Sequence, residues 1–279
     1  EEKKVPYSKY HYKELAAISE DNLAKLNAGP VDPYLLLPIE QRSKVLDPGY
    51  LSVETGWGLL HDGTGLACTR VFFPDCTPEM LNWWFTWHPL EGLRYDIWCP
   101  NCHTDIWMED PDRNRDSSKV DVNIRNWGAK HHPTEGFSFD DGEEILIRFY
   151  SPEEYGLDPI RVALTTCQCI QPIGCFCYKD KTSALFGGDF KLPDSYNGED
   201  LVPFSTALHT ARPVEGGCEL RSRYWIGKTI VNGKAETFKV DGFDYARGAW
   251  TTCRHSLTEY TNLASILGQI YREMEGKID

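Results

Sequence analysis

A histidine and a glutamate stand one helical turn apart near the C-terminal end of the sequence, at His255 and Glu259. Steps of three and four residues continue from them along one face of a predicted helix. That face carries His255, Glu259, Leu263, Ile266, Ile270 and Met274. Both polar side chains need partners, because burying an imidazole or a carboxylate alone costs several kcal/mol.

Three interpretations of this pair fit the pattern. The two side chains could hydrogen-bond to each other, or the helix could start later and leave both in water. They could also be two ligands of a divalent metal, since His and Glu at i and i+4 converge on one point. Further ligands would then come from elsewhere, and the residues leave open the choice among His88, His103, Glu135 and His209. Two His and one or two Glu would suit zinc and leave a position for water.

Two cysteine patterns offer other chemistry. The run from Cys99 to His103 reads C-x-x-C-H, the haem-attachment pattern, but haem attachment needs an export route that the sequence does not show. Two C-x-C pairs, Cys167 with Cys169 and Cys175 with Cys177, could form a four-thiolate zinc site or two disulfides. They could also be thiols on a hairpin-like insertion.

Composition excludes several classes of partner. The net charge of −13 argues against nucleic acid or an anionic membrane, because either would repel the chain. No apolar run approaches the roughly twenty residues of a membrane span. Ten Cys among 279 residues is a low density for a disulfide scaffold, so we expect a cytoplasmic protein with reduced thiols. Nine Trp and fourteen Tyr suit a pocket for a flat organic molecule.

The elements that position these residues predict an α+β fold. Residues 1–50 form an N-terminal helical arm, with a helix from about Tyr12 to Leu26, and residues 51–279 form one domain. Thr77 and Pro78 open a Trp-rich helix, whereas residues 93–98 and 160–164 are expected to be extended. An Asn-Gly turn joins strands at 219–227 and 235–240. Many strands in hairpin order before one long helix predict an antiparallel sheet curved around that helix, with a pocket between them.

Three longer runs resemble a known family. PEMLNWWFTWHPLE at 78–91, LRYDIWCPNCH at 93–103 and FYSPEEYGLD at 149–158 precede the terminal His-x-x-x-Glu in the same order. From about residue 50 to the end, the chain resembles the 2,4-diacetylphloroglucinol hydrolase / phloretin hydrolase family. The resemblance implies a helix-grip fold like that of START and birch-pollen allergen proteins, a homodimer, and zinc-dependent cleavage of the bond between an acyl group and a polyphenol ring.

The resemblance also implies the site. Its zinc ligands would be His103, Glu135, His255 and Glu259. The spacing from His103 to Glu135 differs by about one residue from the family pattern, so Glu143 and Glu144 are rival ligands. Tyr95, His209 and Tyr224 would handle the hydroxyls and protons of a small aromatic ketone substrate.

In such a site a zinc-bound water attacks the ketone carbonyl. The ring carbon is a poor leaving group until the ring is protonated to a keto tautomer. That step favours a general acid or base with a near-neutral pKa, for which His209 is the candidate.

Two other functions fit the same residues. One is a polyketide-tailoring enzyme of the same fold, catalysing retro-Claisen cleavage or cyclisation. The other is a non-catalytic module that binds hydrophobic ligands, since fold does not determine function.

Overall fold

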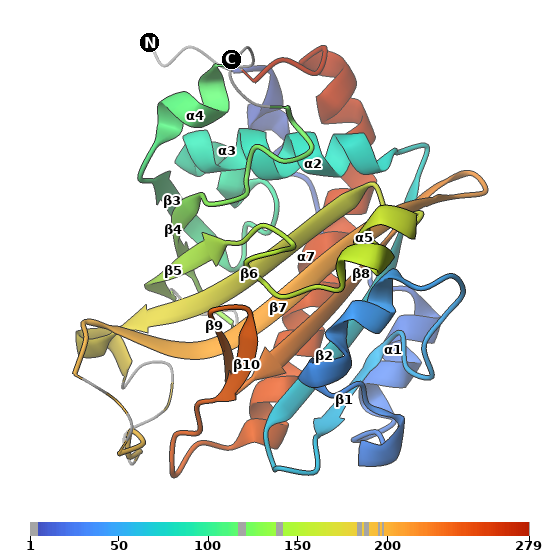
Figure 1. Cartoon of the computed structure of the whole chain (residues 1–279). Helices are drawn as coiled ribbons and strands as arrows, with labels where there is room; N and C mark the ends of the chain where they lie inside the picture. Colours follow the sequence, from blue (N-terminus) through green and yellow to red (C-terminus); the bar gives the residue numbers. More distant parts are fainter. Residues whose placement is uncertain are drawn as a thin grey trace.

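An antiparallel sheet of eight strands dominates the computed structural model, which describes residues 5–116, 121–137, 142–182, 186, 190–194, 196 and 198–278. Its spatial order is β1-β2-β8-β7-β6-β5-β4-β3 (Figure 1). The strands are β1 (Gly56–Leu59), β2 (Gly65–Pro74), β3 (His103–Met108), β4 (Lys130–Glu135), β5 (Glu143–Phe149), β6 (Cys169–Tyr178), β7 (Leu201–Val214) and β8 (Gly217–Ile226). Two further short strands, β9 (Lys228–Val231) and β10 (Lys234–Thr237), form a separate hairpin.

Helices lie against this sheet and around its ends. Within the described ranges, the α-helices are α1 (Glu20–Asn27), α2 (Pro78–Trp87), α3 (Gly92–Asp96), α4 (Pro111–Arg115), α5 (Pro159–Leu164) and α7 (Tyr245–Glu273). Short 3-10 helices are η1 (Pro6–Tyr10), η2 (Pro33–Leu35), η3 (Ile39–Leu46), η4 (His88–Leu90) and η5 (Lys179–Lys181). No helix among the described residues combines the length and the apolar character needed to cross a bilayer.

Helix α7 is the element around which the sheet curves (Figure 1). It packs on β1 and β2, and its buried face includes His255, Glu259, Leu263, Ile266 and Ile270, as predicted from their spacing. The side chain of Asp244 caps its N-terminus by accepting a hydrogen bond from the Arg247 amide. The helix therefore begins well before His255, which excludes the interpretation that left His255 and Glu259 in water. A curved antiparallel sheet around a long C-terminal helix confirms the expected α+β helix-grip architecture.

Helix α2 carries a cluster of tryptophan side chains. Thr77 caps it through the Met80 amide and Pro78 occupies its first turn, as predicted. Trp83, Trp84 and Trp87 are all buried. The predictions for residues 93–98 and 160–164 are wrong, because Gly92–Asp96 and Pro159–Leu164 are short helices. In the second of these helices, the side chain of Asp158 accepts hydrogen bonds from two backbone amides and Pro159 occupies the first turn. These helix-starting features outweigh the strand preference of the β-branched residues that follow.

The N-terminal segment packs on both sides of the sheet. Tyr10 hydrogen-bonds to Glu273 of α7, whereas residues 36–46 cover the face of the sheet that points away from α7. The α-helix of this segment spans only Glu20–Asn27, shorter than the predicted stretch from Tyr12 to Leu26, because the side chain of Ser19 caps it there. The indole of Trp225 on β8 donates to the carbonyl of Leu37, which ties the segment to the sheet. The division of the chain into an N-terminal arm of residues 1–50 and a domain of residues 51–279 stays a prediction.

The predicted Asn-Gly turn is present but joins different strands. Asn232 and Gly233 have φ of 50° and 73°, the left-handed values of a tight hairpin turn. They connect β9 to β10, whereas β8 pairs with β2 and β7. Strand pairing across the main sheet is thus decided by contacts that are distant in sequence.

Candidate metal centre and substrate cavity

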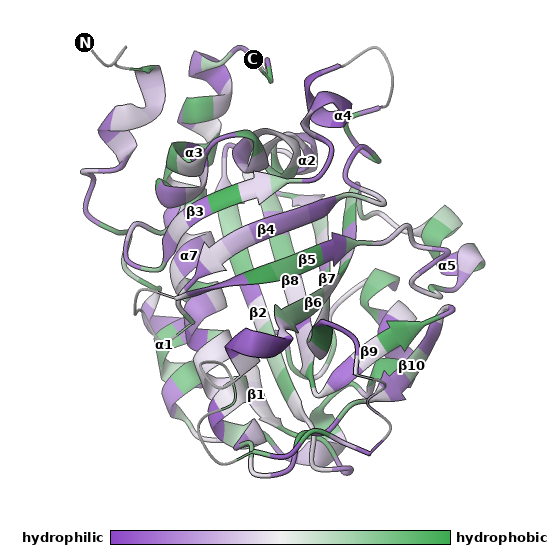
Figure 2. Ribbon diagram, turned by 90° about the vertical axis from the view of Figure 1, so that its left-hand side faces the viewer, coloured by the Kyte–Doolittle hydropathy of each residue, from purple (hydrophilic) through white to green (hydrophobic). Residues whose placement is uncertain are grey.

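Four side chains from three elements converge inside the molecule. His103 is the first residue of β3, and Glu135 is the last residue of β4 and its partner across the antiparallel pair. His255 and Glu259 come from α7. Figure 2 shows β3, β4 and β5 side by side at one edge of the sheet, as their register requires. One ligand atom from each of the four residues lies within 4.8 Å of the others.

The distances fit a shared cation. Nε2 of His255 lies 2.6 Å from Oε1 of Glu135 and 3.8 Å from Oε2 of Glu259. Nε2 of His103 lies 3.4 Å from Oε2 of Glu259 and 3.9 Å from Oε1 of Glu135. Ligand atoms about 2.0–2.1 Å from a zinc ion in tetrahedral geometry would be separated by a little over 3 Å, which matches the middle of this range.

The protonation of His103 suits a ligand. Its Nδ1 lies 3.3 Å from the Tyr95 carbonyl, which only accepts, so Nδ1 carries the proton and Nε2 presents a lone pair. Among the described residues this buried Nε2 has no hydrogen-bond partner. Burial lowers the pKa of His103 to about 3, so the ring is the neutral form that binds metals. An orphaned acceptor that faces two carboxylates is the signature expected of a site built for a cation.

The pKa values of the two carboxyl groups also favour a bound cation. Burial, then the nearby charge of Glu135, raise the pKa of Glu259 well above its usual value. Burial also acts to raise the pKa of Glu135, but its hydrogen bonds with His255 and Tyr95 act in the opposite direction, and its pKa is lowered. Two buried carboxylates this close favour one proton or one cation between them. A divalent metal would satisfy both in their ionised form.

Aromatic side chains hold the four residues in place. The ring of Tyr95 stacks on His103 with centroids 4.0 Å apart, and its hydroxyl donates to Oε2 of Glu135 at 3.1 Å. The indole of Trp98 donates to the Glu259 carbonyl at 3.1 Å. The contacts of Tyr95 orient the side chains of His103 and Glu135, and the contact of Trp98 holds the backbone at Glu259, without occupying the atoms that face the centre of the cluster.

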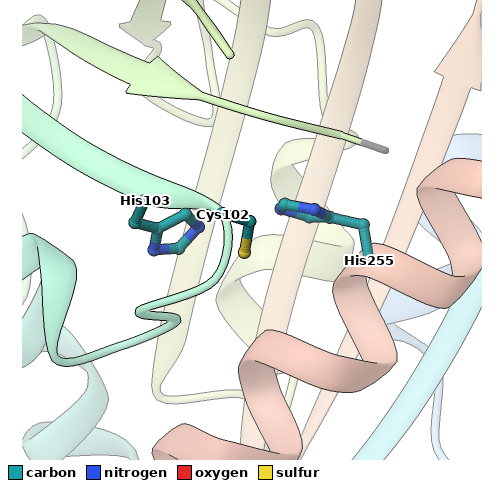
Figure 3. A group of neighbouring side chains, drawn as sticks. All are labelled: Cys102, His103 and His255. Atoms are coloured by element: carbon teal, nitrogen blue, oxygen red, sulfur yellow. The ribbon is translucent and has the colours of Figure 1, made fainter. Parts of the chain in front are cut away.

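A cysteine lies beside the two imidazoles (Figure 3). The sulfur of Cys102 and nitrogens of His103 and His255 lie within 4.8 Å of one another. Cys102 forms a disulfide with Cys99, so the expectation of reduced thiols is wrong for this pair; the other eight cysteines are free. The disulfide also uses both thiols that haem attachment would require.

A cavity of about 450 Å³ opens next to the cluster. This volume lies within the usual range for a small organic ligand. Its walls are mainly aromatic and aliphatic, and include Phe85, Trp98, Ile145, Phe149, Ile173 and Phe204. Glu135 and Glu259 line it, as do all three predicted substrate-handling residues, Tyr95, His209 and Tyr224. The structure thus brings the seven predicted site residues to one place.

The three polar cavity residues differ in their partners. Tyr95 is engaged with Glu135, as described. The hydroxyl of Tyr224 on β8 donates a hydrogen bond of 3.1 Å to the hydroxyl of Ser256, and burial raises the pKa of Tyr224 well above its usual value. Nδ1 of His209 on β7 lies 2.8 Å from the hydroxyl of Ser222. Burial lowers the pKa of His209 to about 3, so the expectation of a near-neutral pKa is wrong and the ring is neutral at physiological pH.

Residues 36–272 match the family model described as the DAPG hydrolase PhiG domain. The chain belongs to this family. The matched range contains all four residues of the cluster. It begins before residue 50, so it includes part of the predicted N-terminal arm.

Three curated proteins are similar to this chain over most of their length. The phloretin hydrolase of Eubacterium ramulus is 29% identical over 290 residues, which cover 98% of this chain and 92% of that protein. The 2,4-diacetylphloroglucinol hydrolase of a Pseudomonas species is 29% identical over 280 residues, covering 96% and 88%. That of Pseudomonas protegens is also 29% identical over 280 residues, covering 96% and 84%.

Solved structures similar to the chain are more distant. Ara h 8.0201 is 8% identical, with 74% of this chain and 99% of that chain covered at a TM-score of 0.37. Protein MLL2253 from Mesorhizobium loti is 10% identical, with 73% and 97% covered at a TM-score of 0.36.

The rival ligands lie outside the cluster. Glu143 pairs with Lys181 at 3.1 Å, and Glu144 accepts a hydrogen bond from the Trp107 indole. His88 and His209 line the cavity but do not join the four-residue group.

The two C-x-C pairs do not form a second metal site. Cys169, Cys175 and Cys177 lie on the single extended strand β6, and Cys167 lies two residues before its start. Eight residues of strand separate Cys169 from Cys177 by about 26 Å, far more than four zinc ligands allow. All four thiols are free, and the segment is a central strand rather than an insertion.

One further histidine of the cavity went unpredicted. His131 lines the cavity from β4. Glu135 follows four residues later on the same face of that strand. Recognising residues 130–135 as a strand would have revealed this relation, but Pro133 and two adjacent histidines obscure the strand pattern.

Proposed function

We propose that this protein is a zinc-dependent hydrolase that cleaves the carbon–carbon bond between an acyl group and a phloroglucinol-type ring. The convergence of His103, Glu135, His255 and Glu259 beside an aromatic cavity carries this proposal. The names of the relatives, a phloretin hydrolase and two 2,4-diacetylphloroglucinol hydrolases, support the substrate class.

The reaction adds water across the scissile bond. The acyl carbon gains the oxygen of water and becomes a carboxylic acid, while the ring carbon gains a hydrogen and leaves as the polyphenol. When bound, zinc supplies Lewis acidity, which polarises the ketone and makes water nucleophilic at neutral pH. Two His and two Glu would hold the ion, because their ligand atoms already face one point.

The polar cavity residues act on the ring. The hydroxyl of Tyr224 turns from Ser256 to donate a hydrogen bond to a ring oxygen, and the neutral imidazole of His209 accepts a hydrogen bond from a ring hydroxyl. Transfer of the proton of that hydroxyl to the ring carbon gives the keto tautomer, from which the ring carbon can leave. Tyr95 acts through Glu135, whose position it fixes. The cavity walls exclude bulk water from the reacting atoms.

Product analysis tests the proposal directly. The zinc-loaded protein would be incubated with phloretin or with 2,4-diacetylphloroglucinol in oxygen-18 water, and the products followed by mass spectrometry. We expect the deacylated polyphenol and a carboxylic acid that carries one label. Bound zinc without cleavage of either compound would contradict the proposal and favour polyketide tailoring. An aromatic ligand bound without any metal would favour a binding module.

Three further properties belong to the same proposal. We infer a homodimer in the cytoplasm, which size-exclusion chromatography with light scattering and cell fractionation would test. We also infer zinc rather than manganese or iron as the native metal. Nitrogen and oxygen ligands accept all three, so metal analysis of protein purified without added metal decides this point.

A further inference from the structure

Two buried histidines face each other in the wall of the cavity, apart from the four-residue cluster. His88 begins η4, directly after α2, and His131 lies on β4. Their ring centroids are 5.9 Å apart, at an angle of 85°. Each is about 3% exposed or less, and both line the cavity. The reaction described above uses neither of them.

The contacts of His88 determine its tautomer. Its Nδ1 lies 2.8 Å from the carbonyl oxygen of Trp84. A carbonyl can only accept, so Nδ1 carries the proton and Nε2 is an acceptor on the opposite side of the ring. Burial lowers the pKa of His88 to about 3, which keeps the ring neutral. His88 therefore offers the cavity a hydrogen-bond acceptor.

His131 has an unused polar atom. Its Nε2 is buried and has no hydrogen-bond partner among the described residues. Burial lowers its pKa well below the usual value, so it too is neutral. A buried polar atom without a partner is costly, and a ligand group in the cavity would remove that cost.

The surroundings favour a hydroxylated aromatic ring rather than an anion. Phe149 lies 4.7 Å from His131 between centroids, and Phe85 lies 6.2 Å from both Phe149 and His88. Among the described residues of the cavity wall, Arg247 alone has a permanent positive charge. It lies in the first turn of α7, at the opposite end of the molecule from α2 and η4 (Figure 1). A carboxylate beside His88 would therefore lack a counter-charge.

The distance from the cluster limits which part of a substrate could reach the pair. His131 and Glu135 lie on the same face of β4, four residues apart, which corresponds to about 13 Å of strand. An acetyl group at the cluster is too short to approach His131. A propanoyl chain that ends in a phenol ring is a molecule of the required order of length.

We propose that His88 and His131 bind a phenol hydroxyl on the acyl side of the substrate, and so select aryl ketones whose acyl chain ends in a hydroxylated ring. The hydroxyl donates to Nε2 of His88 and forms a second hydrogen bond with the unpartnered Nε2 of His131. The assignment to the acyl side rests on the proposed function, because it takes the four-residue cluster as the position of the scissile bond.

Two ligands that differ by one hydroxyl test this inference. They are phloretin and its analogue without the hydroxyl on the acyl-side phenyl ring. We expect wild-type kcat/KM to favour phloretin by about tenfold to a hundredfold, because the analogue leaves the hydrogen-bonding atoms of the two histidines without a partner. In His131→Leu and His88→Leu the preference should fall to nearly one. A wild-type ratio near one, which needs no variant to measure, would overturn the inference.

The control is the neighbouring His132→Leu. His132 is also buried, but it stacks on Trp107 on the other face of β4 and does not line the cavity. His132→Leu should keep the wild-type ratio of kcat/KM for phloretin to kcat/KM for the analogue. If this ratio falls to nearly one, as in His131→Leu, the effect is not specific to His88 and His131.

Calorimetric titration of the same two compounds separates this inference from the proposed function. If wild type cleaves neither compound but binds phloretin at least tenfold more tightly, and the two variants lose that difference, the hydroxyl site stands and the hydrolysis proposal fails. If both compounds are cleaved with equal kcat/KM and bound with equal affinity, hydrolysis stands and the hydroxyl site is wrong.

Discussion

Nε2 of His255 lies 2.6 Å from Oε1 of Glu135, which joins the last helix of the chain to the end of strand β4. The two residues are brought together by the curvature of the sheet around α7. Glu135 is in turn held by the hydroxyl of Tyr95. We therefore expect a substitution at any of these three residues to change metal affinity more than the free energy of unfolding.

Removing one ligand should abolish tight metal binding. We expect His255→Ala to weaken zinc affinity by more than about 100-fold, since loss of even an outer partner of a ligand costs 10- to 100-fold. Elemental analysis of dialysed protein measures the effect. His132→Ala, a buried histidine outside the cluster, should retain zinc; equal zinc in wild type and His255→Ala would show that the four-residue site is wrong.

Tyr95→Phe isolates the hydrogen bond to Glu135. The ring still stacks on His103, so we expect zinc to remain bound but with affinity lower by about tenfold. Competition with a chelator measures the affinity, and circular dichroism checks the fold. Tyr178→Phe is the control, because its hydroxyl bonds to His132 rather than to the cluster. Unchanged affinity in Tyr95→Phe would mean that the hydroxyl does not position the ligand.

The pKa of His209 makes a prediction about pH. With a pKa of about 3 in the folded protein, His209 stays neutral from pH 5 to 8 and gains its proton only in stronger acid. We expect His209→Gln to lower kcat by about 100-fold or more without changing the shape of the kcat/KM profile in that window. If wild type loses activity below pH 6.5 and the variant does not, His209 titrates there and its neutral assignment is wrong.

A buried ion cluster away from the cavity should control stability. Glu54 accepts hydrogen bonds from Arg221 at 2.7 Å and Arg223 at 2.6 Å, and all three side chains are at most 11% exposed. Glu54→Gln leaves two guanidinium groups without their counter-ion, so we expect a loss of about 3 kcal/mol in the free energy of unfolding. Urea denaturation at pH 7 measures it. Glu40→Gln, at an exposed position of η3, should change stability by less than about 0.5 kcal/mol.

The same cluster gives the stability a defined dependence on pH. Burial acts to raise the pKa of Glu54, but the two arginines lower it to about 2. A carboxyl whose pKa is lower in the folded state stabilises it above the unfolded value and loses that effect as pH falls. The difference between wild type and Glu54→Gln should therefore shrink between about pH 4.5 and pH 2. A difference at pH 3 as large as at pH 7 would contradict the ion pairing.

Local patterns in the sequence predicted part of this site. Helical periodicity placed His255 and Glu259 on the buried face of α7, because residues three and four apart share a side of any helix. The start of α2 followed equally from Thr77 and Pro78, whose capping chemistry acts within one turn. The same local reasoning failed at Leu93–Trp98, where alternating apolar residues fit a strand but form a one-turn helix.

The choice of partners for His255 and Glu259 required tertiary structure or the family resemblance. From spacing alone His88, His103, Glu135 and His209 were equal candidates, and only the pairing of His103 with Glu135 across β3 and β4 brings two of them to α7. The four thiols on and next to β6 show the reverse case. Their spacing in the sequence is typical of zinc ligands, but the structure places them far apart along one extended strand. The sequence by itself determined which side chains face inward within each element, because that depends on a local repeat. Which of those side chains meet was decided by strand register and sheet curvature, which arise from contacts between residues far apart in the chain.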